Sequence, residues 1–204
     1  MSIYALKPRF QALLRPLAAA LAHSGVTANR VTIATAAIST AVGAFVAWRA
    51  PARTPFLLIP IWMFVRMALN ALDGILAREF DQQSRLGAYL NELGDIVADA
   101  ALYAPFALLS PFSPIWLAAV IVLAVLAEFA GVMGPLIGAS RRYESPFGKS
   151  DRAFAFGALG LWVGLGGTLP DWLAMALPLF AALLVVTIMN RVQSALAEAR
   201  EIVR

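Results

Sequence analysis

The chain has 204 residues, of which 61% are hydrophobic and 14% are charged. A soluble globular domain is about half apolar and about a quarter charged, so this composition excludes an ordinary soluble protein and predicts an integral membrane protein. The absence of cysteine excludes disulfide bonds and thiolate chemistry, and the net charge of +4 in a membrane chain indicates basic loops facing anionic lipid rather than nucleic acid.

Residues 3–24 alternate apolar and basic positions, with Phe10 and Leu14 among the apolar ones and Lys7 and Arg15 among the basic ones. This pattern predicts an amphipathic helix that lies in the membrane interface. The segment lacks a cleavage site and a proper apolar core, so we do not expect a signal peptide.

Six apolar runs follow, each roughly 20 residues long and therefore able to cross ~30 Å of hydrocarbon. No hydrophilic stretch between them is long enough for a second folded unit. The expected fold is an all-α integral membrane protein, a single domain over 1–204 in which the interfacial helix (3–24) precedes a bundle of six transmembrane helices (31–190). The runs lie near 31–50, 55–78, 85–109, 113–138, 152–168 and 170–190.

The basic residues predict the orientation of this bundle. Of the 16 Lys and Arg residues, only Arg49 and Arg53 fall on one side under the six-span count, and Arg66 lies within a span. All the others fall on the opposite side. Because short basic loops remain in the cytoplasm, both chain termini and the polar end of the second and third spans are expected there.

The stretch from residue 70 to residue 99 carries acids and amides inside otherwise apolar surroundings, where such groups usually mark a functional site. Its polar residues recur at three- and four-residue spacing, which places them on one face of each of two helices. The short polar segment 79–86 would make these helices antiparallel, so their polar faces would meet. Oxygen ligands converging in this way suit a hard divalent cation, Mg²⁺ or Mn²⁺. The residues concerned are Asn70, Asp73, Asn91, Glu92, Asp95 and Asp99.

The same stretch resembles the signature of the CDP-alcohol phosphotransferase family, D-x2-D-G-x2-A-R-x8-G-x3-D-x3-D. Every spacing of that signature is kept between residues 70 and 95. The departures are Asn70 and Asn91, which stand where the family has Asp. This Asn-bearing form resembles a bacterial branch of the family, which implies a bacterial inner membrane location.

The resemblance implies a reaction and a set of roles. Family members transfer a phosphatidyl or similar group from a CDP-linked lipid donor, such as CDP-diacylglycerol, to a small alcohol, and they release CMP with the help of Mg²⁺ or Mn²⁺. The glycines would let the nucleotide approach the backbone, since a Cβ there would block it. By resemblance, Asp95 is the general base; the metal positions are Asn70, Asp73, Asn91 and Asp95; and the nucleotide or diphosphate positions are Asp73, Gly74, Ala77, Arg78 and Gly87.

Two further charges flank the signature. Arg66 lies one turn before Asn70, and Asp99 lies one turn beyond Asp95. An Asn oxygen can bind a cation but brings no charge, so two negative charges are missing relative to the four-Asp pattern. We therefore expect one well-held cation, with the second weak or replaced by Arg66. Asp99 either restores a charge or is structural, paired with Arg66 or Glu128.

The loop 140–151 is the longest polar segment after the start of the chain. Its basic residues indicate either ordinary cytoplasmic anchoring charge or a pocket for a phosphate of the lipid, the diphosphate or the acceptor, since Arg suits bidentate phosphate contacts and Lys acts as a point charge. The slight preference is for an anionic acceptor. The residues are Arg141, Arg142, Lys149 and Arg152.

Other functions and assemblies stay open at this level. The Asn positions are compatible with a homologue that has lost catalysis and serves as a lipid- or nucleotide-binding membrane partner. A transporter is disfavoured because the acids gather at one membrane face rather than along a pore. Glycines recur at three- or four-residue spacing from Gly157 to Gly167, which favours close helix packing within the chain or in a homodimer, and family members often dimerise.

Overall fold

The computed structural model describes residues 6–202, and these residues form seven α-helices joined by loops and short 3₁₀ helices. The all-helical prediction is confirmed. The α-helices are α1 (Leu6–His23), α2 (Ala28–Arg49), α3 (Leu58–Glu79), α4 (Arg85–Tyr103), α5 (Pro114–Met133), α6 (Lys149–Gly164) and α7 (Ala176–Ile202). The 3₁₀ helices are η2 (Thr54–Leu57), η3 (Ala104–Leu108), η4 (Gly134–Ile137) and η5 (Asp171–Met175).

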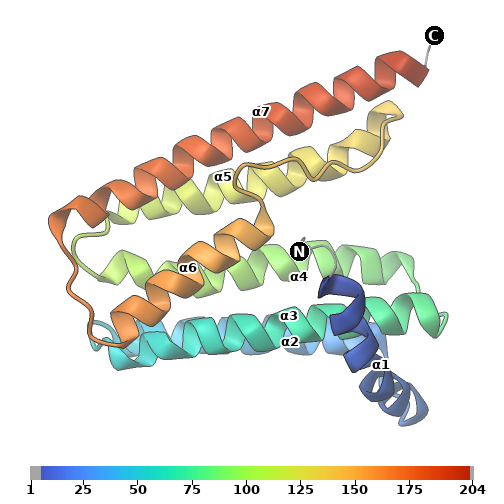
Figure 1. The fold of residues 1–204 in the computed structure, drawn as a ribbon, viewed down its shortest axis with the longest axis horizontal. Coiled ribbons are helices and arrows are strands. Elements are labelled where there is room, and N and C mark those ends of the chain that lie inside the picture. The colour runs from blue at the N-terminus through green and yellow to red at the C-terminus, as the bar shows by residue number, and fades with distance from the viewer. Residues whose placement is uncertain (1–5, 203–204) are drawn as a thin grey trace.

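The long helices form two groups (Figure 1). Helices α2, α3 and α4 lie side by side, and α5 packs along α7. Helix α6 runs obliquely between the groups, starting near the middle of the molecule and ending against η2. Helix α1 crosses the opposite end, against α3. The start of α6 therefore lies near the middle of the long axis of the molecule rather than at one end (Figure 1).

Four segments are long and apolar enough to cross a membrane: Ala28–Arg49, Thr54–Glu79, Pro114–Ile137 and Asp171–Glu201. They coincide with four of the six predicted runs, so the membrane class is confirmed. Helices α4 and α6 occupy the other two runs but are not among these four segments, and each carries a buried charged side chain, Asp99 and Arg152. Their insertion as spans, and hence the count of six, stays a prediction.

Helix α1 confirms a helix within the predicted interfacial segment; residues 3–5 of that segment lie outside the described part. The helix continues through Pro16 without a break. Ala18 is fully buried in a small core with Leu72, Ile75 and Leu76 of α3. An exposed ion pair joins Arg15 Nε to Glu79 Oε2 at 3.0 Å. These contacts attach α1 to the end of α3 that carries the signature.

The glycines of α6 pack within the chain. A Cβ on Gly160 would lie 3.1 Å from the carbonyl oxygen of Phe56, and one on Gly164 would lie 2.5 Å from Leu57 Cγ. Both contacts are to η2, so the small residues allow α6 to approach its own chain closely. Of the two uses predicted for this glycine pattern, the described contacts support packing within the chain.

Side-chain caps begin the two helices that carry the polar site. At the start of α4, Ser84 Oγ accepts a hydrogen bond from the backbone N–H of Gly87 at 2.9 Å. At the start of α6, Asp151 Oδ2 accepts one from the backbone N–H of Gly148 at 2.8 Å. The Ser84 cap satisfies an N–H that has no partner within the helix, a contribution of about 1 kcal/mol, and the N–H of Gly148 also donates to Ser145 Oγ at 2.8 Å.

Candidate active site

The two predicted polar faces meet between antiparallel α3 and α4. Asn70, on α3, donates its Nδ2–H to Asp95 Oδ1, on α4, at 3.1 Å. Asp73, one turn further along α3, is 7% exposed, and its Oδ2 accepts a hydrogen bond from Thr32 Oγ1 of α2 at 3.0 Å. The structure therefore brings Asn70 and Asp95 together and adds Thr32, a residue absent from the signature.

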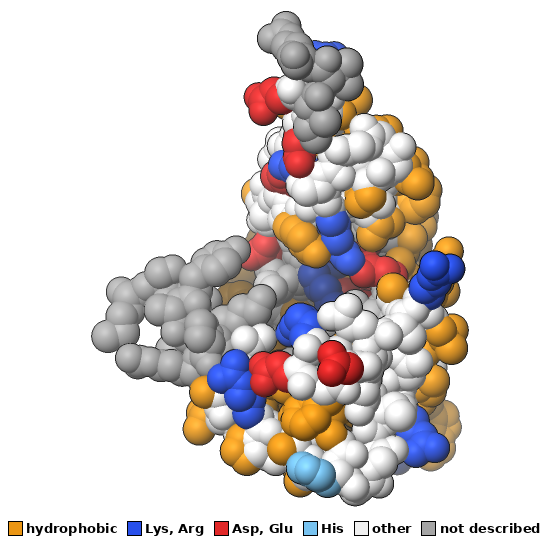
Figure 2. Space-filling view, turned by 90° about the vertical axis from the view of Figure 1, so that its right-hand side faces the viewer, with side chains coloured by type: hydrophobic (Ala, Val, Ile, Leu, Met, Phe, Trp, Pro, Cys, Tyr) orange, Lys and Arg blue, Asp and Glu red, His pale blue; other side chains and the backbone are white. Residues whose placement is uncertain are grey.

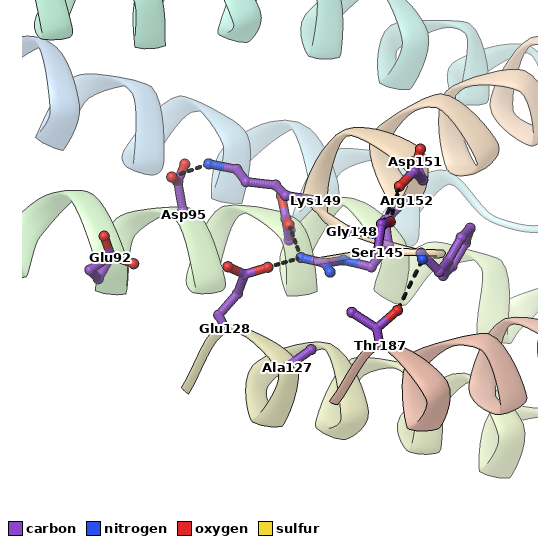
Figure 3. A network of polar contacts seen from close by, with 12 residues as sticks. Glu92, Asp95, Ala127, Glu128, Ser145, Gly148, Lys149, Asp151, Arg152 and Thr187 are labelled. Carbon is purple, nitrogen blue, oxygen red and sulfur yellow. Dashed lines mark hydrogen bonds and ion pairs between the residues drawn. The ribbon is translucent and has the colours of Figure 1, made fainter. Parts of the chain in front are cut away.

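Asp95 is surrounded by donors on both of its oxygens. Its Oδ1 accepts from Arg66 Nη2 at 2.9 Å as well as from Asn70, and its Oδ2 accepts from Lys149 Nζ of α6 (Figure 3). Two of these three donors are cations. Ion pairs of this kind favour the ionised carboxylate over the neutral acid.

Asp99 lies one helical turn deeper and shares a cation with Asp95. Arg66 is only 5% exposed, and its Nη1 donates to Asp99 Oδ1 at 2.5 Å. Arg152 Nη2 lies 3.4 Å from Asp99 Oδ2. The expected pairing of Asp99 with Arg66 is present, and the pairing with Glu128 is indirect, since Arg152 lies between the two acids.

The small residues of the signature have neighbours from this chain. A Cβ on Gly74 would lie 2.8 Å from Nη2 of Arg78, so the missing side chain makes room for that guanidinium. A Cβ on Gly87 would lie 2.7 Å from Oδ1 of Asn29, which allows α2 to reach the start of α4. Ala77 packs against the core that joins α1 to α3. These contacts give all three small residues a packing role, whereas their predicted contact with a nucleotide stays a prediction.

The basic residues of the loop separate into two groups. Arg141 forms a two-pronged ion pair with Glu92 of α4, and Lys149 contacts Asp95. Arg142 instead pairs with Glu144 and Glu198 and is absent from the lining of the cavity described below. The sequence grouped the four basic residues because they are close in the chain, but the bend of the loop directs Arg142 away from the others.

Arg152 is the most buried charge of the site, at 1% exposure. Its Nη2 donates to Glu128 Oε1 of α5 at 2.9 Å (Figure 3). Its Nε and Nη1 have no hydrogen-bond partner among the described residues. Buried donors of this kind are costly unless a ligand or water satisfies them, so they suit an anionic group that enters from the neighbouring cavity.

A cavity of about 1160 Å³ joins these side chains. It lies between α4 and the α5–α7 pair, and the start of α6 forms part of its wall. Figure 2 looks along the molecule at one end, where acidic and basic side chains gather in a central depression and hydrophobic ones cover much of the flank. Among the residues that line the cavity are Asn91, Asp95, Arg141, Lys149 and Arg152.

Sequence reasoning missed Arg191 as a site residue. Arg191 is 2% exposed and donates from Nη1 to the carbonyl oxygen of Ala127 at 2.5 Å. The same nitrogen lies 3.5 Å from Glu128 Oε2. The signal that could have found it is Glu128 itself, because an acid in the middle of an apolar run requires a cationic partner.

The carboxylates around the signature offer few free oxygens to a metal ion. Within residues 6–202, no three His, Cys, Asp or Glu side chains are grouped so that they could hold a metal ion. Asp95 already contacts Arg66 and Lys149 through different oxygens. Asp73 makes no ion pair among the described residues, so it remains available as a carboxylate ligand. A second divalent ion at Asp95 would have to displace two cations.

Membrane-spanning helices with this signature on α3 and α4 define a class of helical membrane proteins. Similarity to known proteins shows which family it is. The sequence profile of CDP-alcohol phosphatidyltransferases matches residues 25–189, and the chain belongs to that family. It is 44% identical over 202 residues to the inner membrane protein YnbA of Escherichia coli strain K12, which covers 99% of this chain and 100% of YnbA.

Two solved structures of the phosphatidylinositol phosphate synthase PgsA1 from Mycobacterium tuberculosis share the fold at 20% identity. The one with CDP-DAG bound has a TM-score of 0.67 and covers 88% of this chain and 92% of its own. The complex with manganese and citrate has a TM-score of 0.69 and covers 88% and 87%. At this identity the likeness shows the fold alone.

Proposed function

We propose that this protein transfers a phosphatidyl-type group from a CDP-activated lipid, such as CDP-diacylglycerol, to an alcohol in phospholipid biosynthesis, with release of CMP. The observation that carries the proposal is the environment of Asp95. This acid belongs to the family signature, contacts a cation through each of its carboxylate oxygens and lines the cavity. This carboxylate is ionised and can accept a proton, and it would become a stronger base once Lys149 moves away from it to a phosphate oxygen.

The transfer would proceed with one bond made and one broken. Asp95 takes the proton of the acceptor hydroxyl, and the resulting oxygen attacks the phosphorus that carries the lipid alcohol. The bond from this phosphorus to the bridging oxygen of the diphosphate breaks, and CMP leaves with the electron pair. Lys149, whose ammonium contacts Asp95 before the substrate arrives, is positioned to move to a phosphate oxygen as the hydroxyl takes its place.

One divalent cation, Mg²⁺ or Mn²⁺, completes the proposal. When bound, it would neutralise the diphosphate and stabilise the charge that develops on CMP. Asp73 would hold it together with the amide oxygens of Asn70 and Asn91. Since Asn70 donates its N–H to Asp95, its carbonyl oxygen is free for a ligand. Gly74, Ala77, Arg78 and Gly87 keep their proposed place near the nucleotide.

The acceptor proposed here is anionic, such as a phosphorylated alcohol. Arg141, Lys149 and Arg152 line the cavity beside Asp95, and two donor nitrogens of Arg152 have no hydrogen-bond partner in the described part of the chain. Arg142 leaves the proposed acceptor set because its guanidinium pairs with Glu144 and Glu198 outside that lining. The basic loops and the YnbA name support a bacterial inner membrane location, with both termini and the site in the cytoplasm.

The experiment is CMP release by the purified full-length protein in nanodiscs. The protein is given CDP-diacylglycerol, Mg²⁺ and a panel of acceptors that pairs each free alcohol with its phosphorylated form. We expect CMP only with an acceptor present and faster release with the phosphorylated partner of a pair. Absence of CMP with every acceptor, together with retained binding of cytidine nucleotide, supports the alternative of a catalytically impaired binding partner.

A further inference from the structure

Arg66 is a buried cation that lies between two acids at the end of the signature. From α3, its guanidinium is inserted between Asp95 and Asp99, one turn apart on α4, at 2.9 Å and 2.5 Å. Its Nη2 also donates to the backbone carbonyl of Asp95 at 3.2 Å. We propose that the guanidinium of Arg66 permanently replaces the second divalent cation at Asp95, so that this chain works with a single metal ion. The inference rests on the proposed function.

Asn70 fits the guanidinium and does not fit a second metal ion. Its Nδ2–H donates to Asp95 Oδ1, the same oxygen that accepts from Arg66. A carboxylate at position 70 would repel Asp95 unless a cation lay between them. An amide in that place forms a hydrogen bond instead, and the opposite orientation of the amide would set its oxygen against an anion. Arg66 and Asn70 therefore both donate a hydrogen bond to Oδ1 of Asp95, and this arrangement needs no metal ion.

The charges agree with this assignment. Replacing Asp by Asn at positions 70 and 91 removes two negative charges from the family pattern, which is the charge that one divalent cation balances. Arg66 then adds one positive charge, which the extra acid Asp99 balances, and its guanidinium is buried between the two carboxylates. A guanidinium is always charged and cannot dissociate, so Asp95 would stay ionised and oriented at any metal concentration.

Mn²⁺ stoichiometry tests the proposal directly. The full chain is placed in phosphatidylcholine nanodiscs, since anionic lipid binds Mn²⁺ itself, and bound Mn²⁺ is counted by equilibrium dialysis and electron paramagnetic resonance. We expect one tight Mn²⁺ per wild-type chain. The variant Asn70→Asp/Asn91→Asp should still bind one, because Arg66 remains in place. Adding Arg66→Met should yield two spin-coupled Mn²⁺ ions, with the second bound at least tenfold more tightly than in the double variant.

Two equally tight Mn²⁺ ions in the wild type overturn the proposal, and so do two in the double variant. A folded triple variant that binds only one also overturns it. If the triple variant does not fold, the first two measurements still decide. CMP release by the same wild-type sample separates this inference from the proposed function. Two Mn²⁺ ions together with CMP release would overturn the role of Arg66 but leave the transferase function standing. The expected stoichiometries without CMP release would support Arg66 as a substitute for a cation and overturn the transferase function.

Discussion

The signature face of α3 and α4 and the cavity beside α5–α7 are both polar, but they are assembled differently. On the signature face, the residues lie three or four apart along two helices joined by a short loop. In the cavity, each contact joins distant parts of the chain: Glu92 with Arg141, Asp99 with Arg152, and Glu128 with Arg191. Short-range helical geometry organises the first region, and only packing organises the second.

The comparison suggests a division of labour. The signature face carries the groups proposed for the chemistry, and their spacing along the two helices sets their geometry. The cavity wall carries the groups proposed for the acceptor, and its polar contacts can change without disturbing the helix pair. Lys149 joins the regions, because it starts α6 and contacts Asp95. Changes on the two sides should therefore produce different kinds of loss.

The largest effect is expected from Asp95→Asn. The amide keeps the size of the side chain but cannot accept the hydroxyl proton, so CMP release should fall by about 10³-fold. Thermal unfolding should show a folded protein. Asp171→Asn, an exposed change on η5, is the matched control and should leave the rate unchanged. A variant at position 95 that keeps more than a tenth of the wild-type rate removes Asp95 as the general base.

A second, smaller effect is expected from Arg152→Met. The change leaves Glu128 and Asp99 with one cationic partner fewer in a buried setting, and breaking such a pair costs about 3 kcal/mol in the free energy of unfolding. Arg15→Met is the control, because its ion pair with Glu79 is exposed and such pairs contribute little, so its melting temperature should match the wild type. Equal melting temperatures for both variants would show that the buried network is not structural.

The pair Glu92 and Arg141 separates a structural from a binding role. Glu92 forms an ion pair with the guanidinium of Arg141, the group that we propose binds an anionic acceptor. Arg141→Gln should raise the KM for that acceptor about tenfold, the loss of one charge-assisted hydrogen bond. Glu92→Gln should lower the KM, since it removes the competing carboxylate. If both variants raise the KM, the ion pair holds the loop in place and Arg141 does not bind the acceptor.

The smallest effect concerns Glu144, in the loop outside the spans. Burial raises the pKa of this carboxyl, but hydrogen bonds from Arg142 and backbone N–H groups outweigh it and bring the pKa below its ordinary value of 4.5. A depressed folded-state pKa contributes stability above the unfolded pKa, and that stability is lost as pH falls through the folded one. The wild type should therefore melt slightly above Glu144→Gln at pH 7, and the difference should disappear once the pH falls below the lowered pKa of Glu144 in the folded protein.

If the melting temperatures of the two proteins still differ at low pH, Glu144 stabilises the loop by packing rather than by its negative charge. The effect should be small because Arg142 keeps its second ion pair, with Glu198 of α7, when Glu144 is replaced. This prediction therefore tests the part of the loop that lies outside the cavity lining and away from the proposed acceptor.

The sequence by itself determined the class of protein, the positions of the helices and the signature. Apolar runs predict helices because each must satisfy its own backbone hydrogen bonds in lipid, and the spacing of residues 70–95 places polar groups on one face of each helix. It also indicated that Arg66 and Asp99 belong beside the signature, since they lie one turn from its ends.

Only the tertiary structure decided which cation meets which acid. Lys149 and Asp95 are 54 residues apart, and Arg152 and Asp99 are 53 apart, so no local rule pairs them. The pairing depends on the distance and burial of the charges, which are set when α6 enters the bundle and the loop before it bends. For the same reason, composition counted Arg191 as anchoring charge and grouped Arg142 with the pocket, whereas packing buries the first and directs the second to Glu144 and Glu198.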